Sequence, residues 1–507
     1  MSSSVNKNTA IAPGVGTLAK GQLRTIDAIA ISVSVLSPGM AMQLNTGGVA
    51  AVAGGSTPLS TLLGGIGCLA LAFVVIGFTR RMAAAGYAYT YVSRSLGKPS
   101  GFMAGWMYAF GFLCFVPMTM AAVGFLVADL LGLAPGWWIV FFVIGMVLLL
   151  GLSLIRIHTT TRVQLVVGIL TVAILVVVAL VVTAKGGLHG QSAAPFTFGK
   201  THSGGFNGVF YGLILGITSF IGFESAADFG EETANPRRSV PIAVLAAVIF
   251  AIVLYVWVTY ATTIGYGVNE LQKDPSPWVA NGVAGVAQTY IGTFMAKLVE
   301  IGALLSAFIV CVACATAGSR TLFAMGREGV LPTWFSRTHP RYKTPFNATL
   351  VVAAIATVIA VVVGYGFTNN DLGQPFTVYA LMATIGTLAV LLVYIGLCIG
   401  AIPYFRRESR RFNPLVHGLV PLIGAVVFAA AWYGSVYPVP AAPILAAPYV
   451  TIVWLLLGVG FLLWLRRNRS DAVERIGTIL GEEGGELVES LDEPSAHRQE
   501  SRTEQPH

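Results

Sequence analysis

Long apolar runs alternate with short polar segments over most of this chain. Each run is close to the roughly 20 residues with which an α-helix crosses a bilayer. An outer-membrane barrel is excluded, because its strands would be about 10 residues long and would alternate strictly between apolar and polar positions. The pattern therefore predicts an all-α integral membrane protein with twelve transmembrane helices. Their expected cores are residues 26–51, 57–79, 101–128, 137–155, 162–184, 206–229, 239–266, 293–325, 346–365, 376–400, 415–434 and 447–465.

Two of these predicted spans contain an interruption. The first span holds Ser37-Pro38-Gly39, where proline removes a backbone donor and glycine adds conformational freedom. The sixth span holds Gly222-Phe223-Glu224. When the spans are counted in two groups of five, spans one and six correspond, and paired interruptions of this kind point to a transporter site near the bilayer midplane. The alternative is that Pro38 only kinks a packed helix.

Unwound backbone at such interruptions frees amide and carbonyl groups. The amides at the start of a half-helix suit a carboxylate, and the carbonyls at the end of one suit an ammonium group or a cation. A site that offers both kinds of group matches a zwitterionic amino acid.

Glu224 places a carboxylate at membrane depth, which costs roughly 2.5–3.5 kcal/mol or more and is interpreted as functional by default. Three roles are open for it: binding a cationic group of the substrate, relaying a proton, or bracing the sixth span through hydrogen bonds from freed backbone amides. Asp228, four residues later, would lie on the same helix face and line the inner mouth of the pathway.

Composition and charge agree with the membrane assignment. Of the 507 residues, 55% are hydrophobic and only 10% are charged, whereas soluble domains carry about 25% charged residues. With the N-terminus inside, the external segments hold Lys185, Lys200, Lys273 and Lys297, and the other 26 of the 30 Lys and Arg residues are cytoplasmic. This distribution predicts a multi-pass protein of the cell membrane with both termini in the cytoplasm. It also explains the net charge of +8 without a nucleic acid partner.

The remaining polar residues predict no catalytic or metal site. All five cysteines lie in apolar runs. Cys311 and Cys314 are spaced as CxxC but have no second pair or histidine nearby, so they are interpreted as small buried residues. The histidines fall in loops, at span ends or in the C-terminal tail, without a Ser, Asp or metal-like cluster. We therefore expect no enzyme activity, no metal and no cofactor.

Three motifs follow one another along the chain. The most specific combines residues 220–225 (FIGFES) with 231–241 (EETANPRRSVP), the second runs from 85–89 (AGYAY) to Trp106, and the third is 319–332 (SRTLFAMGREGVLP). With these motifs, the chain resembles the amino acid–polyamine–organocation permeases over nearly its full length, to about residue 465.

The resemblance implies a five-plus-five inverted repeat with broken helices one and six, and alternating access to a substrate held at the two breaks. The corresponding divisions are a cytoplasmic N-terminal tail at 1–25, repeats at 26–200 and 201–402, two additional transmembrane helices at 403–467, and a disordered cytoplasmic tail at 468–507. The residues that would meet the substrate on this basis are Leu36, Ser37, Gly39, Met40, Ala41, Phe220, Ile221, Gly222 and Glu224.

The sequence departs from the family pattern at two positions. Pro38 stands where many members have Gly or Ser, so one amide donor is missing. Thr218 stands where some members carry a large aromatic lid, four residues before the glycine of span six. We therefore expect a roomier site, with Thr218 in its wall and Phe220 or Phe223 as a substitute lid.

The coupling ion is left open between H⁺ and Na⁺. Some proton-coupled members place a lysine in span five in the role of sodium, but span five of this chain carries no charge, and Thr171 falls near that position. Thr171 and Ser306 would give hydroxyl oxygens to Na⁺, because hard cations prefer oxygen ligands. Glu224 or Glu300 would instead carry a proton. For Glu300 the alternative is a self-neutralising pair with Lys297, three residues before it.

A cluster of charged residues at the inner ends of the spans is a candidate cytoplasmic gate. Ion pairs within it would hold the inner side closed, and the alternative is a topology signal with exposed pairs of little energetic value. Its members are Arg80, Arg81, Asp228, Glu231, Glu232, Arg237, Arg238 and Arg320.

Together these features predict a secondary active transporter that moves an amino acid or a related amine across the cell membrane, with ion-coupled uptake and a slight preference for the proton. The partners expected are the small-molecule substrate, H⁺ or Na⁺, and membrane lipid, and the oligomeric state is left open. The alternatives are an exchanger of the same fold, a transporter-like sensor that signals through its tail, and an integral-membrane enzyme, which would need His, Asp or Glu clusters on facing spans.

Overall fold

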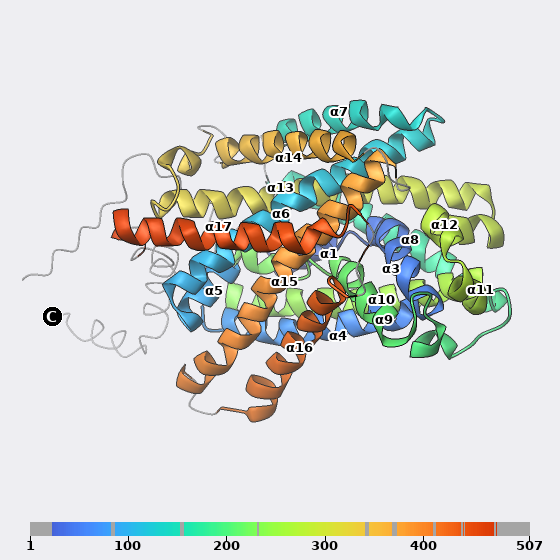
Figure 1. Cartoon of the computed structure of the whole chain (residues 1–507), viewed down its shortest axis with the longest axis horizontal. Coiled ribbons are helices and arrows are strands. Elements are labelled where there is room, and N and C mark those ends of the chain that lie inside the picture. Colours follow the sequence, from blue (N-terminus) through green and yellow to red (C-terminus); the bar gives the residue numbers. More distant parts are fainter. Residues whose placement is uncertain are drawn as a thin grey trace, which may run out of the picture.

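The computed structural model of the chain is a bundle of helices (Figure 1). It describes residues 23–82, 87–152, 157–230, 233–339, 344–367, 373–408, 412–437, 440, 442–470 and 473, without the side chains of 157–163, 228 and 229. The α-helices are α1 (Thr25–Leu36), α2 (Pro38–Met40), α3 (Thr46–Ala53), α4 (Thr57–Thr79), α5 (Tyr87–Leu96), α6 (Lys98–Leu130), α7 (Trp138–Leu152), α8 (Ile157–Lys185), α9 (Gly205–Thr218), α10 (Pro236–Tyr266), α11 (Val268–Lys273), α12 (Ser276–Tyr290), α13 (Thr293–Arg327), α14 (Phe346–Gly366), α15 (Gln374–Glu408), α16 (Val420–Gly434) and α17 (Ala446–Asn468). Shorter π or 3₁₀ segments are η1 (Ala41–Asn45), η2 (Gly54–Ser56), η3 (Pro135–Trp137), η4 (Ala194–Phe196), η5 (Phe198–Lys200), η6 (Ser225–Phe229), η7 (Thr333–Ser336) and η8 (Leu415–Leu419).

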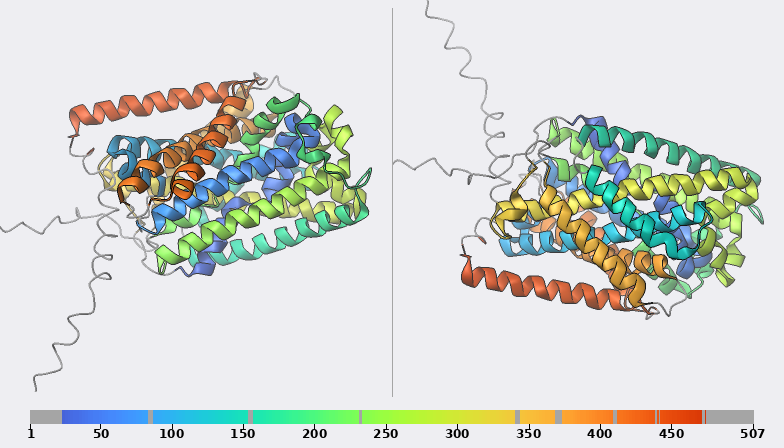
Figure 2. Two further views of the ribbon diagram at one scale, coloured as in Figure 1. Left: turned by 90° about the horizontal axis from the view of Figure 1, so that it is seen from below. Right: turned by 90° about the horizontal axis from the view of Figure 1, so that it is seen from above.

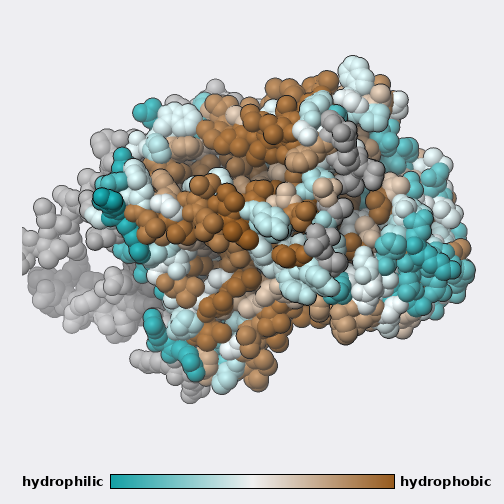
Figure 3. All heavy atoms as spheres, in the orientation of Figure 1, coloured by the Kyte–Doolittle hydropathy of each residue, from teal (hydrophilic) through white to brown (hydrophobic). Residues whose placement is uncertain are grey.

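The all-helical membrane class is confirmed, whereas the number of twelve spans is not. Within the described residues, ten helical stretches are long and apolar enough to cross a membrane. One of them, Thr25–Thr79, is 55 residues long and contains the first two predicted spans. The helix of the sixth span, α9, has 14 residues and is too short to be counted alone. Hydrophobic residues cover the middle of the face in Figure 3, with hydrophilic residues toward its ends, as a lipid-embedded protein requires.

Three long helices, α6, α13 and α15, pack together in the bundle. The 33 residues of α6 pack against α13 and α15, and most of its side chains are buried. In the views of Figure 2 the long helices run together along the molecule, and α17 lies at its outer side. The large exposed aliphatic side chains of α7, α8 and α17 accordingly face the surroundings of the bundle, where lipid replaces water.

The first break is present at the predicted residues. Helix α1 ends at Leu36, Ser37 adopts a left-handed conformation (φ 49°, ψ 61°), and α2 begins at Pro38. A proline disfavours helical geometry in the residue before it, so α1 cannot continue through Ser37. Pro38 itself stands at the first position of the new segment, where its missing N–H would have no helical partner. The π-helical η1 follows, and the outer half of this span is therefore irregular as well.

The sixth span is interrupted earlier than the sequence predicts. We expected the interruption to begin at Gly222 within a core that runs to residue 229, but α9 ends at Thr218 and turns occupy 219–224. The following segment, η6, is a 3₁₀ helix. Gly222 has φ 111°, a conformation that favours glycine, and its N–H donates to Glu224 Oε2 at 3.0 Å. This local bond to a side chain replaces a helical bond to the backbone.

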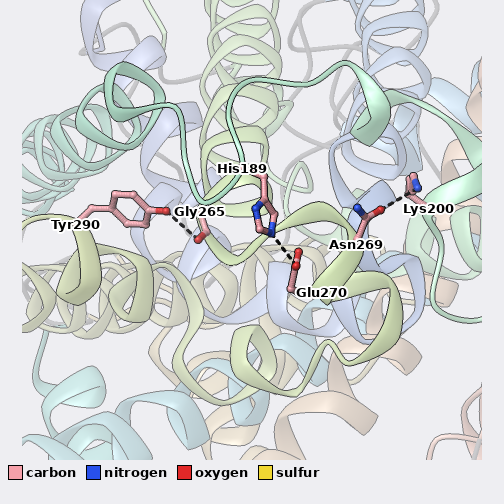
Figure 4. A network of polar contacts seen from close by, with 6 residues as sticks. All are labelled: His189, Lys200, Gly265, Asn269, Glu270 and Tyr290. Atoms are coloured by element: carbon pink, nitrogen blue, oxygen red, sulfur yellow. Dashed lines mark hydrogen bonds and ion pairs between the residues drawn. The ribbon is translucent and has the colours of Figure 1, made fainter.

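A polar network ties the segment between α8 and α9 to α11, at the end of the bundle predicted to be external (Figure 4). His189 Nε2 lies 2.8 Å from Glu270 Oε1, and Lys200 Nζ donates to Asn269 Oδ1 at 2.9 Å. The Tyr290 hydroxyl donates to a carbonyl oxygen of α10 at 3.1 Å. The first two contacts hold the connecting segment against α11, and the third joins α12 to α10.

The Glu270 contact predicts a small loss of stability in acid. The hydrogen bond from His189 holds the pKa of the Glu270 carboxyl below its ordinary value. A lowered carboxyl pKa contributes stability above the unfolded-state pKa, and that contribution disappears as the pH falls through the folded-state pKa. Because both side chains are about half exposed, we expect less than about 1 kcal/mol. The measurement is the thermal midpoint of the purified protein near pH 7 and near pH 3.

Glu270→Gln should lower the midpoint near neutral pH and leave it unchanged in acid. Asn269→Ala is the matched control, because it removes an amide group of the same network, which does not titrate, and should act equally at both pH values. An equal effect of Glu270→Gln at both pH values would contradict the prediction.

Candidate functional site

The two broken segments touch each other in the centre of the bundle. A Cβ atom placed on Gly222 would lie 2.4 Å from Val35 Cγ1 and 3.0 Å from the Val35 carbonyl carbon. Real side chains do not approach so closely, so only glycine allows the break of span six to lie against the end of α1. The Ala226 N–H also donates to Ser32 Oγ at 3.1 Å, which joins η6 to α1 one turn further along.

A small cavity lies between the two breaks. Its volume is about 30 Å³, which is room for one or two water molecules, whereas sites for small-molecule ligands measure roughly 300–1,000 Å³. The cavity is therefore too small to hold an amino acid in this conformation. The lining residues are Val35, Leu36, Ser37, Met40, Asn45, Phe112, Phe115, Met118, Thr119, Thr218, Ile221, Val310 and Cys314.

The cavity contains some of the predicted substrate residues and not others. Five of them line it: Leu36, Ser37, Met40, Thr218 and Ile221. The other six, which lie outside its lining, are Gly39, Ala41, Phe220, Gly222, Phe223 and Glu224.

The proposed substitute lid does not lie over the cavity. Phe220 is fully buried and packs on Tyr255 of α10, with 5.2 Å between ring centroids. Phe223 is also fully buried and absent from the cavity wall. Thr218 lines the cavity, and its hydroxyl group donates to Ile214 O at 2.8 Å and lies 2.6 Å from Thr387 Oγ1 of α15.

Glu224 is completely buried and faces α15. Its Oε1 accepts a hydrogen bond from the Tyr394 hydroxyl at 2.5 Å, and its Oε2 accepts the Gly222 N–H at 3.0 Å. The carboxylate thus connects the break of span six to α15, 170 residues away. These hydrogen bonds are those of a brace for the sixth span, and Glu224 lies outside the lining of the cavity.

Of the two hydroxyl groups suggested for sodium, that of Ser306 reaches the break of span one and that of Thr171 does not. Ser37 Oγ lies 2.8 Å from Ser306 Oγ of α13. Thr171 also approaches, but its methyl group points toward Gly39, while its hydroxyl donates to Val167 O at 2.7 Å in its own helix. A sodium ion at this place would therefore find the hydroxyl groups of Ser37 and Ser306, which are already hydrogen-bonded to each other.

Sequence reasoning missed the wall formed by α6 and α13. Phe112, Phe115 and Met118 of α6 face Val310 and Cys314 of α13 across the cavity. Both helices are apolar nearly all round, so no periodic pattern distinguishes a side chain in the cavity from one in the core.

Polar contacts close the site on the side of η1. The Asn45 amide group donates to Ser219 Oγ at 3.1 Å, and the Tyr379 hydroxyl of α15 donates to Asn45 Oδ1. Asn45 lines the cavity, so these bonds lie beside it. They link the outer half of span one to both the sixth span and α15.

Glu300 lies in a second, more polar pocket, away from the breaks. This pocket has a volume of about 150 Å³ and also contains Asp129 and Gln43. Glu300 Oε2 lies 2.7 Å from Lys297 Nζ, which is the ion pair that the spacing of three residues predicts. The pair sits at the end of α13 that is predicted to be external.

The cytoplasmic gate is only partly described. Glu231 and Glu232 lie outside the described residues, and so does the side chain of Asp228. Arg81 packs over the Phe405 ring, 4.7 Å from its centroid. Arg80 and Arg238 are exposed, and Arg237 and Arg320 are half-buried.

Backbone contacts hold the inner ends of spans one and six together. Leu23 and Thr233 form a parallel β-bridge, in which the Ala234 N–H donates to Leu23 O at 2.7 Å. Asn235 then adopts a left-handed conformation (φ 52°) before Pro236 begins α10. The Asn-Pro pair of the most specific motif therefore sets the turn from this bridge into the next helix.

Comparisons with known proteins support the resemblance drawn from the motifs. Residues 23–466 match the model of a family described as amino acid permease. The branched-chain amino acid permease BcaP of Lactococcus lactis subsp. cremoris (strain MG1363) is 26% identical over 460 residues, which cover 86% of this chain and 92% of the relative. The methylthioribose transporter of Bacillus subtilis (strain 168) is 27% identical over 369 residues, covering 69% and 74%.

The low-affinity putrescine importer PlaP of Escherichia coli (strain K12) is 27% identical over 311 residues, which cover 57% of this chain and 64% of the relative. These relatives carry different substrates by name but are all transporters. Since the family match covers most of the chain, the chain belongs to the amino acid permeases of the amino acid–polyamine–organocation superfamily, and it is a multi-pass membrane transporter and not an enzyme.

Proposed function

We propose that this permease is a secondary active transporter that takes up a neutral amino acid with an apolar side chain across the cell membrane. The observation that carries the proposal is the cavity between the two breaks. Among the described residues, its lining contains no Asp, Glu, Lys or Arg side chain. The charged ends of a substrate would therefore bind to backbone groups, and its side chain would meet apolar walls.

The break of span one supplies donors for a carboxylate. Gly39 and Met40 stand in the first turn after Ser37, where backbone N–H groups have no partner within the helix. The partial positive charge of such a helix start favours an anion. Across the cavity, the chain turns at 219–224 after the end of α9, and carbonyl groups freed there would bind the substrate's ammonium group.

The wall formed by α6 and α13 argues for an apolar substrate side chain. Phe112, Phe115, Met118 and Val310 would surround it, and each offers only hydrocarbon, ring or thioether surface. The second ammonium group of a diamine would be buried here without a partner, which is far more costly than burying a neutral group. We therefore place branched-chain amino acids and methionine ahead of putrescine.

The closed state of the cavity supports alternating access as the proposed mechanism. The five-plus-five repeats at 26–200 and 201–402 would rock against each other, with helices at 403–467 added at the side and both termini in the cytoplasm. Opening toward the inside would separate Leu23 from Thr233, whereas opening toward the outside would break the bonds of Asn45. The predicted ion pairs of the gate would strengthen the inner closure.

A proton is the better candidate for the coupling ion. Within the described chain, both carboxylate oxygens of Glu224 meet neutral donors, and no Lys, Arg or His lies within ion-pair distance. A buried carboxylate charge without a cation is expensive, so this group is suited to carry a proton. The sodium alternative has weaker support, because Thr171 points its methyl group at the break and uses its hydroxyl within its own helix.

The test is uptake by the purified protein in liposomes. With an inward proton gradient, we expect saturable uptake of leucine, isoleucine, valine or methionine at least about 100-fold more efficient than uptake of putrescine, which corresponds to roughly 2.8 kcal/mol. An exchanger would require amino acid inside the vesicles, and a sensor would bind without flux. No amino acid flux under any proton or sodium gradient would contradict the transporter mechanism proposed here.

A further inference from the structure

A kink in α12 lies against η1, the π-helical segment that follows the break of span one. At the kink, Gly282 has φ 56° and ψ −146°, which is not a helical conformation. A Cβ atom on Gly282 would lie 2.3 Å from the Gln43 carbonyl oxygen and 2.7 Å from the Gln43 side-chain amide. Only glycine therefore allows the kink to approach η1 so closely. Figure 1 shows α12 beside α3, the helix that continues from η1.

The Gln43 side chain binds backbone groups on both sides of this kink. Its Nε2 donates to Asn281 O at 3.0 Å, and its Oε1 accepts the Ala284 N–H at 2.9 Å. One partner is an acceptor and the other is a donor, so only this orientation of the amide satisfies both. Gln43 is only 8% exposed, so these bonds are largely shielded from water. The side chain thus joins η1 to the kink of α12.

Residues 43–45 of η1 form a wall between two spaces. Gln43 and Leu44 line the polar pocket of about 150 Å³ at the end predicted to be external, whereas Asn45 lines the cavity at the breaks. On another side of the polar pocket, the rings of Phe125 and Phe376 pack with 4.4 Å between their centroids. A substrate that moved from this pocket to the cavity would therefore have to pass η1.

We propose that Gln43 is a positioning residue that holds η1 against α12 and so keeps the outer side of the substrate path closed. Gln43 itself is absent from the described lining of the cavity and acts through η1. A second contact supports the same closure, because Trp278 Nε1 of α12 donates to Thr46 Oγ1 at 3.2 Å. The inference rests on the alternating access proposed above, but its test needs neither the substrate nor the coupling ion.

A native cysteine reports whether the outer side is open. Cys314 lines the substrate cavity, whereas the other four cysteines are buried elsewhere. The probe is sulfonatoethyl methanethiosulfonate, an anion that does not cross membranes. It transfers its sulfonatoethylthio group to a thiol and releases methanesulfinate. Added to intact cells that produce the full-length protein, it reaches Cys314 only through an outer opening, and the mass of the purified chain then counts the modified cysteines.

In Gln43→Met we expect Cys314 to react about fivefold faster or more than in the unmodified protein. Methionine is similar to glutamine in size and shape, but it leaves Asn281 O and the Ala284 N–H without a partner in the closed state. Water satisfies both groups in the open state, so the substitution disfavours only the closed state. Losing two neutral hydrogen bonds in one state shifts the ratio of the states by at least about this factor.

Asn281→Ala is the matched control on the other side of the contact. The Asn281 side chain donates to Pro277 O within α12, so its removal leaves the carbonyl group that Gln43 binds, and the reaction rate should not change. Gln43→Met/Cys314→Ser should not react, which assigns the modification to Cys314. Gln43→Glu keeps an acceptor for the Ala284 N–H but loses the donor to Asn281 O. It serves if Gln43→Met fails to fold, and it should also react faster than the unmodified protein.

Three outcomes would overturn the proposal. Equal rates in the unmodified protein and in both Gln43 variants would refute the role of Gln43 but leave alternating access supported, since Cys314 would still be reached from outside. Modification of Gln43→Met/Cys314→Ser would mean that the substitution loosens the packing around other cysteines instead of opening the path. No reaction in any variant would contradict an outer opening altogether, and with it both the role of Gln43 and the proposed transport cycle.

Discussion

Glu224→Gln is expected to fold, to bind the substrate and to lose accumulation driven by a proton gradient. Its amide oxygen can accept the Gly222 N–H, and its amide nitrogen can donate to the Tyr394 hydroxyl oxygen. The variant therefore reproduces the contacts of a neutral, protonated glutamate but cannot release a proton. The break of span six keeps its geometry, while the cycle between charged and neutral states is removed.

The measurement separates accumulation from exchange. In proteoliposomes with an inward proton gradient, we expect concentrative uptake to fall by about tenfold or more, while counterflow between equal amino acid pools stays within about threefold of the unmodified protein. Unchanged accumulation in Glu224→Gln would remove Glu224 from the coupling mechanism. Accumulation driven by a sodium gradient alone would instead support a sodium site at Ser37 and Ser306.

Two further variants separate coupling from folding. Tyr394→Phe leaves the carboxylate able to take up a proton but deprives it of one charge-assisted hydrogen bond, worth about 1.5–3 kcal/mol. It should lower stability and retain coupling. Glu224→Ala leaves two buried donors without an acceptor, at about 1–3 kcal/mol each, so it should fail through misfolding rather than through a defined loss of coupling.

The first break could be predicted from the sequence because its chemistry is local. Proline at position 38 constrains Ser37 before it and cannot bond within the preceding helix, whatever surrounds them. The sequence predicts the interruption that ends α9 four residues too late. The turn there is stabilised by Glu224, which is itself held by Tyr394, and a contact across 170 residues leaves no signal in a local pattern.

Some residues of the cavity wall can likewise be predicted from the local sequence, and others depend on tertiary packing. Leu36, Ser37 and Met40 follow from the position of the break, whereas Phe115 and Val310 depend on how α6 and α13 pack. The charge pattern likewise marked the inner ends of the spans without indicating which pairs form. The bridge between Leu23 and Thr233 involves no charged or otherwise unusual side chain, so the sequence does not predict it.

Gly222→Ala is expected to abolish uptake and to destabilise the protein by about 2–5 kcal/mol. An L-residue in a left-handed conformation costs roughly 1–2 kcal/mol, and Gly222 has φ 111°. The added methyl group would also lie 2.4 Å from Val35 Cγ1, and overpacking of this kind costs about 1–3 kcal/mol. The two broken segments would be pushed apart at the place where the proposed substrate site lies between them.

Thermal unfolding and uptake of the purified variants measure this effect. Gly168→Ala is the matched control, because its added Cβ meets nothing within 4 Å and a helical glycine gains up to about 1 kcal/mol on becoming alanine. Combining Gly222→Ala with Val35→Ala removes the methyl group at 2.4 Å but not the unfavourable φ, so part of the stability should return. Normal uptake and an unchanged melting temperature in Gly222→Ala would show that the two breaks need not touch for the substrate site to form.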